Sequence, residues 1–252
     1  MAVDRLFFYS IFGLGFGVYI FFKSFCTYRE KKMIENTPTS KVRSLAMGRV
    51  EVYGNVVPDK NNVVKTPFSN QECVFCLWRI EEYKRSGKSS RWVIIKKGLK
   101  GGHFFIKDDT GIVLVDPNGA RIEIPSSFQF ETGIGKEPDK HIISFCEEIG
   151  LPHKGLIFNK KLKFIEQAIR EDNKLYIMGY AGDNPYVEDG SAEKNEADIM
   201  IQKGNSSFYY ISNKPEKEIL KSYGLRLLGG LLGGGALIIV CLFYIFFYLR
   251  IL

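Results

Sequence analysis

The sequence has few of the residues from which metal and redox sites are built, with five cysteines and three histidines in 252 residues. Two of the cysteines lie in or beside long hydrophobic segments, which argues against the disulfide framework of a small secreted domain. A structural zinc site needs four Cys or His ligands, whereas the histidines are scattered at His103, His141 and His153. Cys73 and Cys76 form one close pair, and residues three apart in the strand expected here point to opposite faces. We therefore expect these cysteines to pack in the core, and we predict no metal ion and no cofactor.

Motifs of several enzyme classes are also missing. The chain contains no G-x-S-x-G and no H-E-x-x-H, and Gly98-Leu99-Lys100-Gly101-Gly102 lacks the Lys-Ser/Thr end of a phosphate-binding loop. That glycine-rich stretch instead predicts a flexible hairpin. The acidic pairs Asp108-Asp109 and Glu147-Glu148 fall in an expected turn and an expected helix, where solvated charge is the usual role. We name no catalytic residue, and the sequence favours a protein without catalysis of its own.

The chain does have two long hydrophobic runs, at 6–22 and 227–249. About 17 residues at about 1.5 Å each just cover the hydrocarbon core of a bilayer, and the second run is longer and ends in aromatic residues. A secretory signal would need a basic start and a small-residue cleavage site, which the first run lacks. We therefore predict a two-pass integral membrane protein with this layout: tail 1–5, transmembrane helix 6–22, basic linker 23–40, soluble domain 41–214, connecting helix 215–224 and transmembrane helix 225–250.

Glycines recur in both runs at the four-residue spacing that lets membrane helices approach closely. Counted from the domain-side end, the two sets lie at similar depths. We predict that the two helices pack against each other through Gly13, Gly17, Gly229, Gly230, Gly233 and Gly234. Glycine is also common in membrane helices in general, so an ordinary compositional role stays open.

Basic residues flank the two runs on the domain side, namely Lys23, Arg29, Lys31, Lys32, Lys217, Lys221 and Arg226, against Arg5 and Arg250 on the far side. The positive-inside rule then puts the domain in the cytoplasm, with these residues at the membrane surface. Much of the net charge of +7 is attributed to these same residues beside the hydrophobic runs, which would contact anionic headgroups. Nucleic acid is the less favoured partner, because we find no Arg/Lys-rich helix and no arginine–aromatic run in the middle of the chain.

Between the hydrophobic runs, alternating and β-branched segments predict a mainly β domain, a small barrel or sandwich with one or two short helices. Asn118-Gly119 favours a tight turn, so 112–116 and 120–124 are expected to pair antiparallel. A helical period over 139–149, ended by Gly150, predicts a helix that covers the sheet. The expected strands are 46–54, 73–83, 92–96, 103–107, 112–116, 120–124, 164–169, 175–180, 199–202 and 208–211.

A family resemblance follows from the order of several short motifs. They are Pro38-Thr39-Ser40, Gly48-Arg49-Val50-Glu51-Val52-Tyr53-Gly54, Pro67-Phe68-Ser69-Asn70-Gln71-Glu72-Cys73-Val74, Phe105-Ile106-Lys107-Asp108-Asp109-Thr110-Gly111, Val115-Asp116-Pro117-Asn118-Gly119-Ala120, Tyr176-Ile177-Met178-Gly179-Tyr180-Ala181 and Ile211-Ser212. Together they resemble the GIDE domain, also called BAM for "beside a membrane", of the mitochondrial membrane-anchored RING ubiquitin ligases. The resemblance covers roughly residues 37–220, and the flanking runs match the two-span layout of that family.

The resemblance implies an E3 ubiquitin ligase-like protein, although not the RING itself. In the ligases a RING follows the second helix, and it needs eight Cys or His ligands for two zinc ions. Arg250-Ile251-Leu252 cannot supply them, so we expect a RING-less member of the prokaryotic or archaeal type. In the mitochondrial members the domain lies in the intermembrane space, which is opposite in sense to the charge argument and leaves the side open.

Three functions are compatible with these observations. The preferred one is a non-enzymatic interaction domain at the bilayer that binds a protein or lipid partner, and a homo-oligomer is compatible with it. The second is a ubiquitin-ligase-like component that works with a separate RING protein. The third is an oligonucleotide-binding barrel, whose stacking residues would be Phe75, Trp78, Trp92, Phe104 and Phe105.

Overall fold

The structure, a computed structural model, describes residues 2–59, 62–87, 89–133, 136–151, 161–186, 198–205 and 208–249. The chain divides into two units. The first joins the two ends of the chain, Met1–Pro38 and Lys214–Leu252, and the second is Thr39–Asn213. Each unit is described by itself below.

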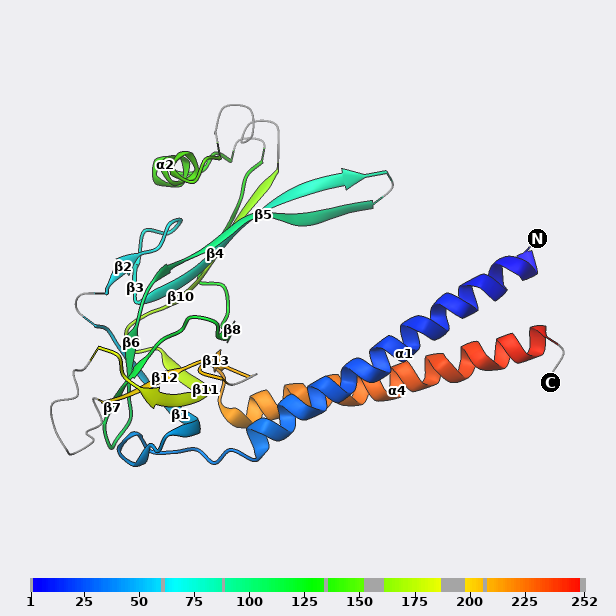
Figure 1. Cartoon of the computed structure of the whole chain (residues 1–252). Helices are drawn as coiled ribbons and strands as arrows, with labels where there is room; N and C mark the ends of the chain where they lie inside the picture. The colour runs from blue at the N-terminus through cyan, green and yellow to red at the C-terminus, as the bar shows by residue number, and fades with distance from the viewer. Residues whose placement is uncertain are drawn as a thin grey trace. The chain divides into compact units, whose positions relative to one another are not determined.

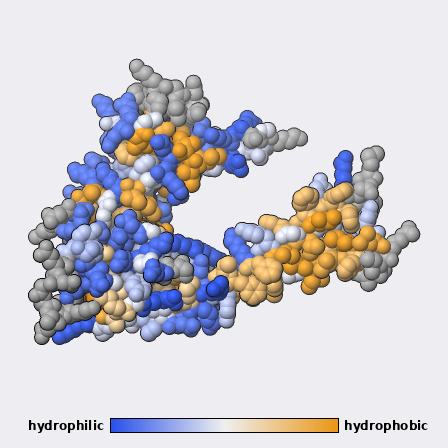
Figure 2. All heavy atoms as spheres, viewed as in Figure 1, coloured by the Kyte–Doolittle hydropathy of each residue, from blue (hydrophilic) through white to orange (hydrophobic). Residues whose placement is uncertain are grey.

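The first unit is a pair of long helices, α1 (Ala2–Glu35) and α4 (Glu216–Tyr248), which lie side by side in Figure 1 with the two termini at the same end. Both helices are long and apolar enough to cross a membrane, and only 11% of each apolar window is buried. They are therefore not the core helices of a globular protein, and Figure 2 shows their hydrophobic side chains on the outside. α1 continues through 23–35, where the sequence predicted a linker, and α4 contains both the predicted connecting helix and the second apolar run.

The second unit is mainly β, as predicted, and contains a closed five-stranded barrel. Its strands follow the order β1-β6-β7-β12-β11, and β11 pairs again with β1 to close the ring. All of these pairs are antiparallel except β12 with β7, which is parallel. The bounds are β1 Gly48–Val57, β6 Phe104–Lys107, β7 Ile112–Val115, β11 Lys174–Asp183 and β12 Ile199–Gln202, with the short helix η1 (Val42–Ser44) before β1.

The barrel is filled by aliphatic side chains from alternate positions of these strands. Val50, Val52 and Val56 of β1 are at most 4% exposed and pack against Ile106 and Ile177. β-Branched residues of this kind suit a pleated surface that is buried on one side. The alternation read from the sequence is thus the one that builds the barrel core.

Two further strands, β13 (Tyr210–Ser212) and β8 (Arg121–Glu123), extend the sheet beyond β11. The predicted hairpin between 112–116 and 120–124 is wrong. The tight turn exists, with Gly119 at φ +76° and the Ala120 amide donating to the Pro117 carbonyl. However, β7 pairs with β12 and β8 pairs with β13, both in parallel, because segment 199–212 runs alongside both arms.

Tyr209 holds that arrangement in place. Its hydroxyl donates to the Asp116 carbonyl at 2.5 Å, and its own carbonyl accepts from the Arg121 amide at 2.8 Å. The backbone groups that a hairpin would have paired are therefore already satisfied by the later segment.

A second, all-antiparallel sheet follows the order β5-β4-β10-β9. α2 (Lys140–Glu148) packs on one face of it and confirms the predicted helix. The bounds are β4 Phe75–Ser86, β5 Ser89–Gly101, β9 Phe128–Glu131 and β10 Leu162–Ile169, and a small hairpin is formed by β2 (Val64–Lys65) and β3 (Glu72–Cys73). The stretch from Gly98 to Gly101, predicted as a hairpin, lies in β5 and pairs with β4, while the chain turns near Gly87.

We call the side of this sheet under α2 the covered face. Phe68 lies at its centre, with ring centroids 5.2 Å from Phe164, 5.7 Å from Phe145 and 6.1 Å from Trp78. The buried carboxyl group of Glu166 accepts hydrogen bonds from the Phe68 amide, the Ser69 amide at 3.2 Å and the Ser69 hydroxyl at 2.7 Å. Glu166 thereby fixes the loop that inserts Phe68.

Candidate functional site

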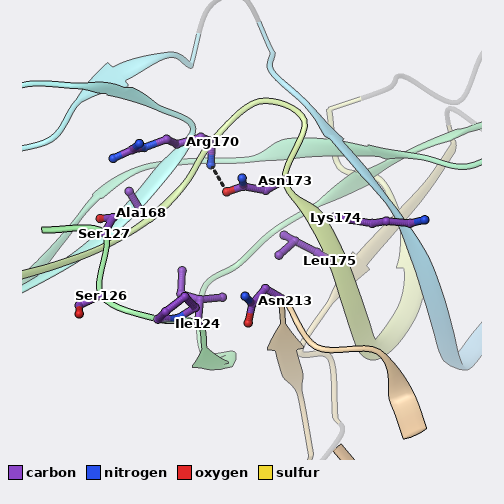
Figure 3. A pocket seen from close by; sticks show the side chains of 10 residues that line it. Ile124, Ser126, Ser127, Ala168, Arg170, Asn173, Lys174, Leu175 and Asn213 are labelled. Carbon is purple, nitrogen blue, oxygen red and sulfur yellow. Dashed lines mark hydrogen bonds between the residues drawn. The ribbon is translucent and has the colours of Figure 1, made fainter. Parts of the chain in front are cut away.

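A pocket of about 390 Å³ opens where the barrel meets the second sheet (Figure 3). Five separate parts of the second unit contribute to it: the segment between β8 and β9, the end of β10, the turn that follows, the start of β11 and the residue after β13. Its lining is mixed polar and apolar and consists of Ile124, Pro125, Ser126, Ser127, Ala168, Arg170, Asn173, Lys174, Leu175 and Asn213.

The pocket forms because β9 and β10 stay paired only as far as Glu166. The last backbone hydrogen bond between the two chain segments runs from the Ser127 amide to the Glu166 carbonyl at 2.8 Å. Beyond it, the side chain of Gln167 donates to the Ile124 carbonyl at 2.6 Å, so a side chain rather than the backbone ladder joins the β8–β9 segment to β10. No described strand pairs with Ala168 on this side, so the pocket lies along an open strand edge.

The turn after β10 positions Arg170 and Asn173. Asp172 adopts the left-handed φ of +60°, and the Asn173 side chain accepts from the Arg170 amide at 2.9 Å, as the dashed line in Figure 3 shows. Asp and Asn tolerate this conformation better than most residues, which explains their use in so tight a turn. The Arg170 side chain leaves the turn on the side of Ala168.

Arg170 has hydrogen-bonding capacity that the described residues leave unused. Its Nε and Nη2 are buried and have no hydrogen-bond partner among them. A guanidinium presents these donors as a fork that fits a carboxylate or a phosphate with two parallel bonds. Arg170 therefore brings a positive charge to the pocket, beside the Ser, Asn and Lys side chains at its wall.

Cys73 and Cys76 lie near Arg170, and the prediction that they point to opposite faces is wrong. The chain bends at Val74 between β3 and β4, so both thiols pack with Ala168 in one small cluster. A hydrogen bond between the thiols, aided by Arg170 and Lys100, lowers the pKa of Cys73, and the same bond and burial raise that of Cys76. Both are at most 2% exposed, and no cluster of three or more Cys, His, Asp or Glu suited to a metal ion occurs in the described part of the chain.

The side of the second sheet opposite α2, which we call the open face, is a second candidate. It carries exposed apolar side chains, with Tyr83 42%, Ile94 52% and Leu99 55% exposed. A register shift at Ile80/Glu81 lets β5 keep its hydrophobic residues on this face on both sides of the shift. The face consists of Leu77, Arg79, Glu81, Tyr83 and Arg85 from β4 and of Trp92, Ile94, Lys97 and Leu99 from β5.

A shallow, mainly apolar pocket of about 450 Å³ lies on the open face. Leu77 and Leu99 contribute its apolar surface, and Arg79 and Lys97 its cations. Farther along, the Lys163 ammonium lies 4.2 Å from the centroid of the Trp92 ring and pairs with Glu131 at 2.8 Å. That pairing lowers the pKa of Glu131.

The sequence analysis missed the charge of this region. The β4–β5 hairpin, residues 75–101, holds eight Lys and Arg and two Glu, a net charge of +6 out of +7 for the whole chain. The cations alternate with hydrophobic residues along the two strands and do not form a continuous run. The criterion of an Arg/Lys-rich helix therefore did not detect them. Counting charge over a predicted hairpin would have found it.

The six predicted packing glycines occupy two kinds of position in the helix pair. Added Cβ atoms at Gly17 and Gly234 would lie 3.2 Å and 3.0 Å from backbone atoms of the opposite helix, Gly13 would meet the Cys241 sulfur at 2.8 Å, and Gly230 would meet Ser24. Gly229 and Gly233 have no such atom within 4 Å. The helices thus approach closely at one glycine face, and the energetic role of these residues stays a prediction.

The predicted membrane-surface cations all lie on the two helices. Lys23, Arg29, Lys31 and Lys32 are on α1, and Lys217, Lys221 and Arg226 are on α4. Lys31 and Lys32 pair with Glu35 at 2.9 Å and 2.8 Å. Their role at a membrane surface stays a prediction.

The aromatic residues proposed for base stacking are largely taken up by packing. Phe75 is 2% and Phe104 0% exposed in the barrel core, and Trp78 packs against Phe145 on the covered face, 5.1 Å between ring centroids. Burial of the first two removes them as stacking platforms.

A comparison with protein families places the chain beside a known family. A family model described as GIDE, E3 ubiquitin ligase, matches residues 79–243. The match begins in β4 and ends within α4, so it takes in the second sheet, most of the barrel and much of the second apolar helix. Neither the curated proteins nor the solved structures compared with the chain gave a match.

Proposed function

The chain belongs to the GIDE family, described as E3 ubiquitin ligase, and from this premise we propose that it is a two-pass membrane protein whose β domain binds a partner at the bilayer surface. The two apolar helices that flank the domain are its anchors. The excess of Lys and Arg beside the anchors supports a cytoplasmic domain by the positive-inside rule. Tethering at both ends keeps the domain at a high local concentration near membrane partners.

The observation that carries the proposal is Arg170. Burying a cation whose donors are unpaired costs free energy, so such groups are rare in folded proteins unless they serve a ligand. The open edge of β10 beside it offers main-chain groups to an extended peptide, as sheets do when they bind an added strand. The function supported best is therefore recognition of a protein segment that carries a carboxylate or phosphate.

The test is site-specific photo-crosslinking from the pocket wall of the full chain in its native membrane. A photoreactive residue at Asn213 should give a discrete adduct, and Arg170→Met in the same chain should abolish it. The same substitution removes unpaired donors, so it should leave the free energy of unfolding unchanged or raise it by about 1–3 kcal/mol. Loss of binding together with unreduced stability distinguishes a ligand site from a structural residue.

The matched control is Arg49→Met, which removes an exposed arginine from β1. It should keep the adduct. An adduct that survives Arg170→Met, or no adduct from any pocket position, contradicts the proposal.

The family description favours one second candidate, a component of ubiquitin transfer. It is tested by adding the purified chain in nanodiscs to ubiquitin, activating enzyme and conjugating enzyme, with and without a separate RING protein. Ubiquitin transfer that depends on this chain would support the ligase role. Equal transfer with and without it would leave the binding role alone.

A further inference from the structure

We infer that the open face of the β4–β5 hairpin is a membrane-contact surface that binds anionic lipid. The inference rests on the proposed membrane anchoring and names a partner class for a surface to which nothing else has been assigned. It uses residues separate from the Arg170 pocket and can fail without affecting that site.

The first argument is charge. Five exposed cations of the hairpin form no ion pair with any residue in the described ranges: Arg85 and Lys97 lie on the open face, and Arg91, Lys96 and Lys100 lie on the other side of the same two strands. Each Lys or Arg near an anionic bilayer contributes about 1 kcal/mol to binding. Two unpaired cations on the open face, with three more on the same two strands, therefore favour contact with such a surface.

The second argument is hydrophobic exposure on the same hairpin. Tyr83, Ile94 and Leu99 are exposed on the face that also presents Arg79, Arg85 and Lys97. Tyr83 and Trp92 pack with their ring centroids 5.2 Å apart and their planes inclined at 60°, and such amphipathic rings prefer the headgroup level of a membrane. Cations around an aromatic and aliphatic centre match the chemistry of a lipid interface.

These features favour lipid over nucleic acid. Phosphates of either polymer or bilayer would attract the cations, but Ile94 and Leu99 gain nothing from a nucleic acid, whereas burying them among acyl chains removes apolar surface from water. The proposed membrane helices α1 and α4 also hold the domain next to a bilayer. A lipid surface is thus always present at high local concentration.

The two tryptophans of the chain allow a direct test, because Trp92 lies on the open face and Trp78 on the covered face. The full chain is reconstituted in nanodiscs of phosphatidylcholine alone or with roughly 30% phosphatidylglycerol. Acyl chains brominated near the headgroup quench tryptophan only on contact. Emission should be quenched in the anionic discs, and Trp92→Phe should remove that quenching because the Trp78 ring packs against Phe68 and Phe145 on the other side of the sheet.

Charge reversal supplies the second variant. Arg85→Glu with Lys97→Glu should lower the equilibrium constant for lipid contact by roughly 30-fold, about 2 kcal/mol, while Trp78 emission reports an intact fold. Equal quenching in neutral and anionic discs, or none in either, would overturn the inference. If tryptophan emission is not quenched and the reconstituted protein instead binds a single-stranded oligonucleotide tightly, the surface is assigned to nucleic acid. A chain that does not insert into discs at all would refute the membrane anchoring itself.

Discussion

Phe164 on the covered face of the second sheet is 0% exposed, whereas Leu99 on the open face of the same sheet is 55% exposed. Both faces are made by the same strands, since successive residues of a strand point to opposite sides. The covered face packs against α2 and the Phe68 loop, and the open face presents apolar side chains and cations to solvent.

The two faces also treat acidic residues differently. Glu166 on the covered face is fully buried and held by donors from Phe68 and Ser69. Glu131 on the open side is partly exposed and paired with Lys163 and Lys161 at 2.8 Å and 3.4 Å. We therefore expect the covered face to determine stability, and the open face is the one we propose to bind, a division that matched substitutions can test.

The largest effect is expected for Phe164→Ala, which leaves a cavity among Phe68, Phe130 and the residues under α2. It should lower the free energy of unfolding by about 3–5 kcal/mol. Leu99→Ala on the open face should change it by less than about 0.5 kcal/mol. Urea unfolding of the full chain in detergent, with Trp92→Phe as the background so that emission comes from Trp78, measures both free energies. Similar losses in the two variants would contradict the difference between the faces.

The carboxyl groups give the next contrast. Glu166→Gln places an amide donor against the donors of Ser69 and should cost about 1–3 kcal/mol. Glu131→Gln removes an exposed pair and should cost at most about 1 kcal/mol. Pairing lowers the folded-state pKa of Glu131, so its contribution is present above the unfolded carboxyl pKa and is lost as the pH falls through the folded value. Unfolding curves at several pH values should show this loss of free energy of unfolding in the parent chain and not in Glu131→Gln.

Two glycines sharpen the comparison at smaller scale. A Cβ at Gly98 would lie 2.5 Å from the Trp78 ring, whereas one at Gly102 would meet nothing closer than 3.7 Å. Gly98→Ala should therefore cost about 1–3 kcal/mol by overpacking. Gly102→Ala should be within about 0.5 kcal/mol of the parent. The same unfolding assay measures both variants. If Gly98→Ala leaves the free energy of unfolding unchanged, the Trp78 ring moves aside without cost.

The helix pair contains an equivalent contrast between neighbouring residues. Gly234 faces the backbone of Phe21, whereas Gly233 has open space around it. Gly234→Leu should weaken association of the two helices by about 1–2 kcal/mol, and Gly233→Leu should not. Disulfide trapping between cysteines placed on the two helices in detergent would measure the difference, and equal trapping in both variants would argue against close packing.

Much of the fold could be predicted from sequence because hydrophobic periodicity is local. It predicted β12 at 199–202 with its observed bounds, α2 to within one residue at each end, and both apolar helices. Strand partners are not local, and the 112–124 segment shows the consequence. Its turn was predicted, but the sequence could not reveal that 199–212 would satisfy both arms.

The candidate sites were harder to predict for the same reason. The Arg170 pocket is assembled from parts of the chain between Ile124 and Asn213 that no spacing connects. The cysteine pair was misjudged because the bend at Val74 breaks the strand alternation on which the argument relied. The basic hairpin was within reach of sequence, since its charge depends only on composition and one turn.

Ile94 and Ile95 test the central claim most directly, because they are adjacent, identical in type and on opposite sides of the sheet. Ile94 is 52% exposed on the open face, and Ile95 packs into the covered core. Each is changed to Ser in the full chain, and both unfolding and quenching by brominated anionic lipid are measured. The account predicts that Ile95→Ser lowers the free energy of unfolding by about 2–4 kcal/mol and keeps lipid contact, and that Ile94→Ser keeps stability and loses lipid contact. The reverse pattern, or equal effects of the two variants, would contradict it.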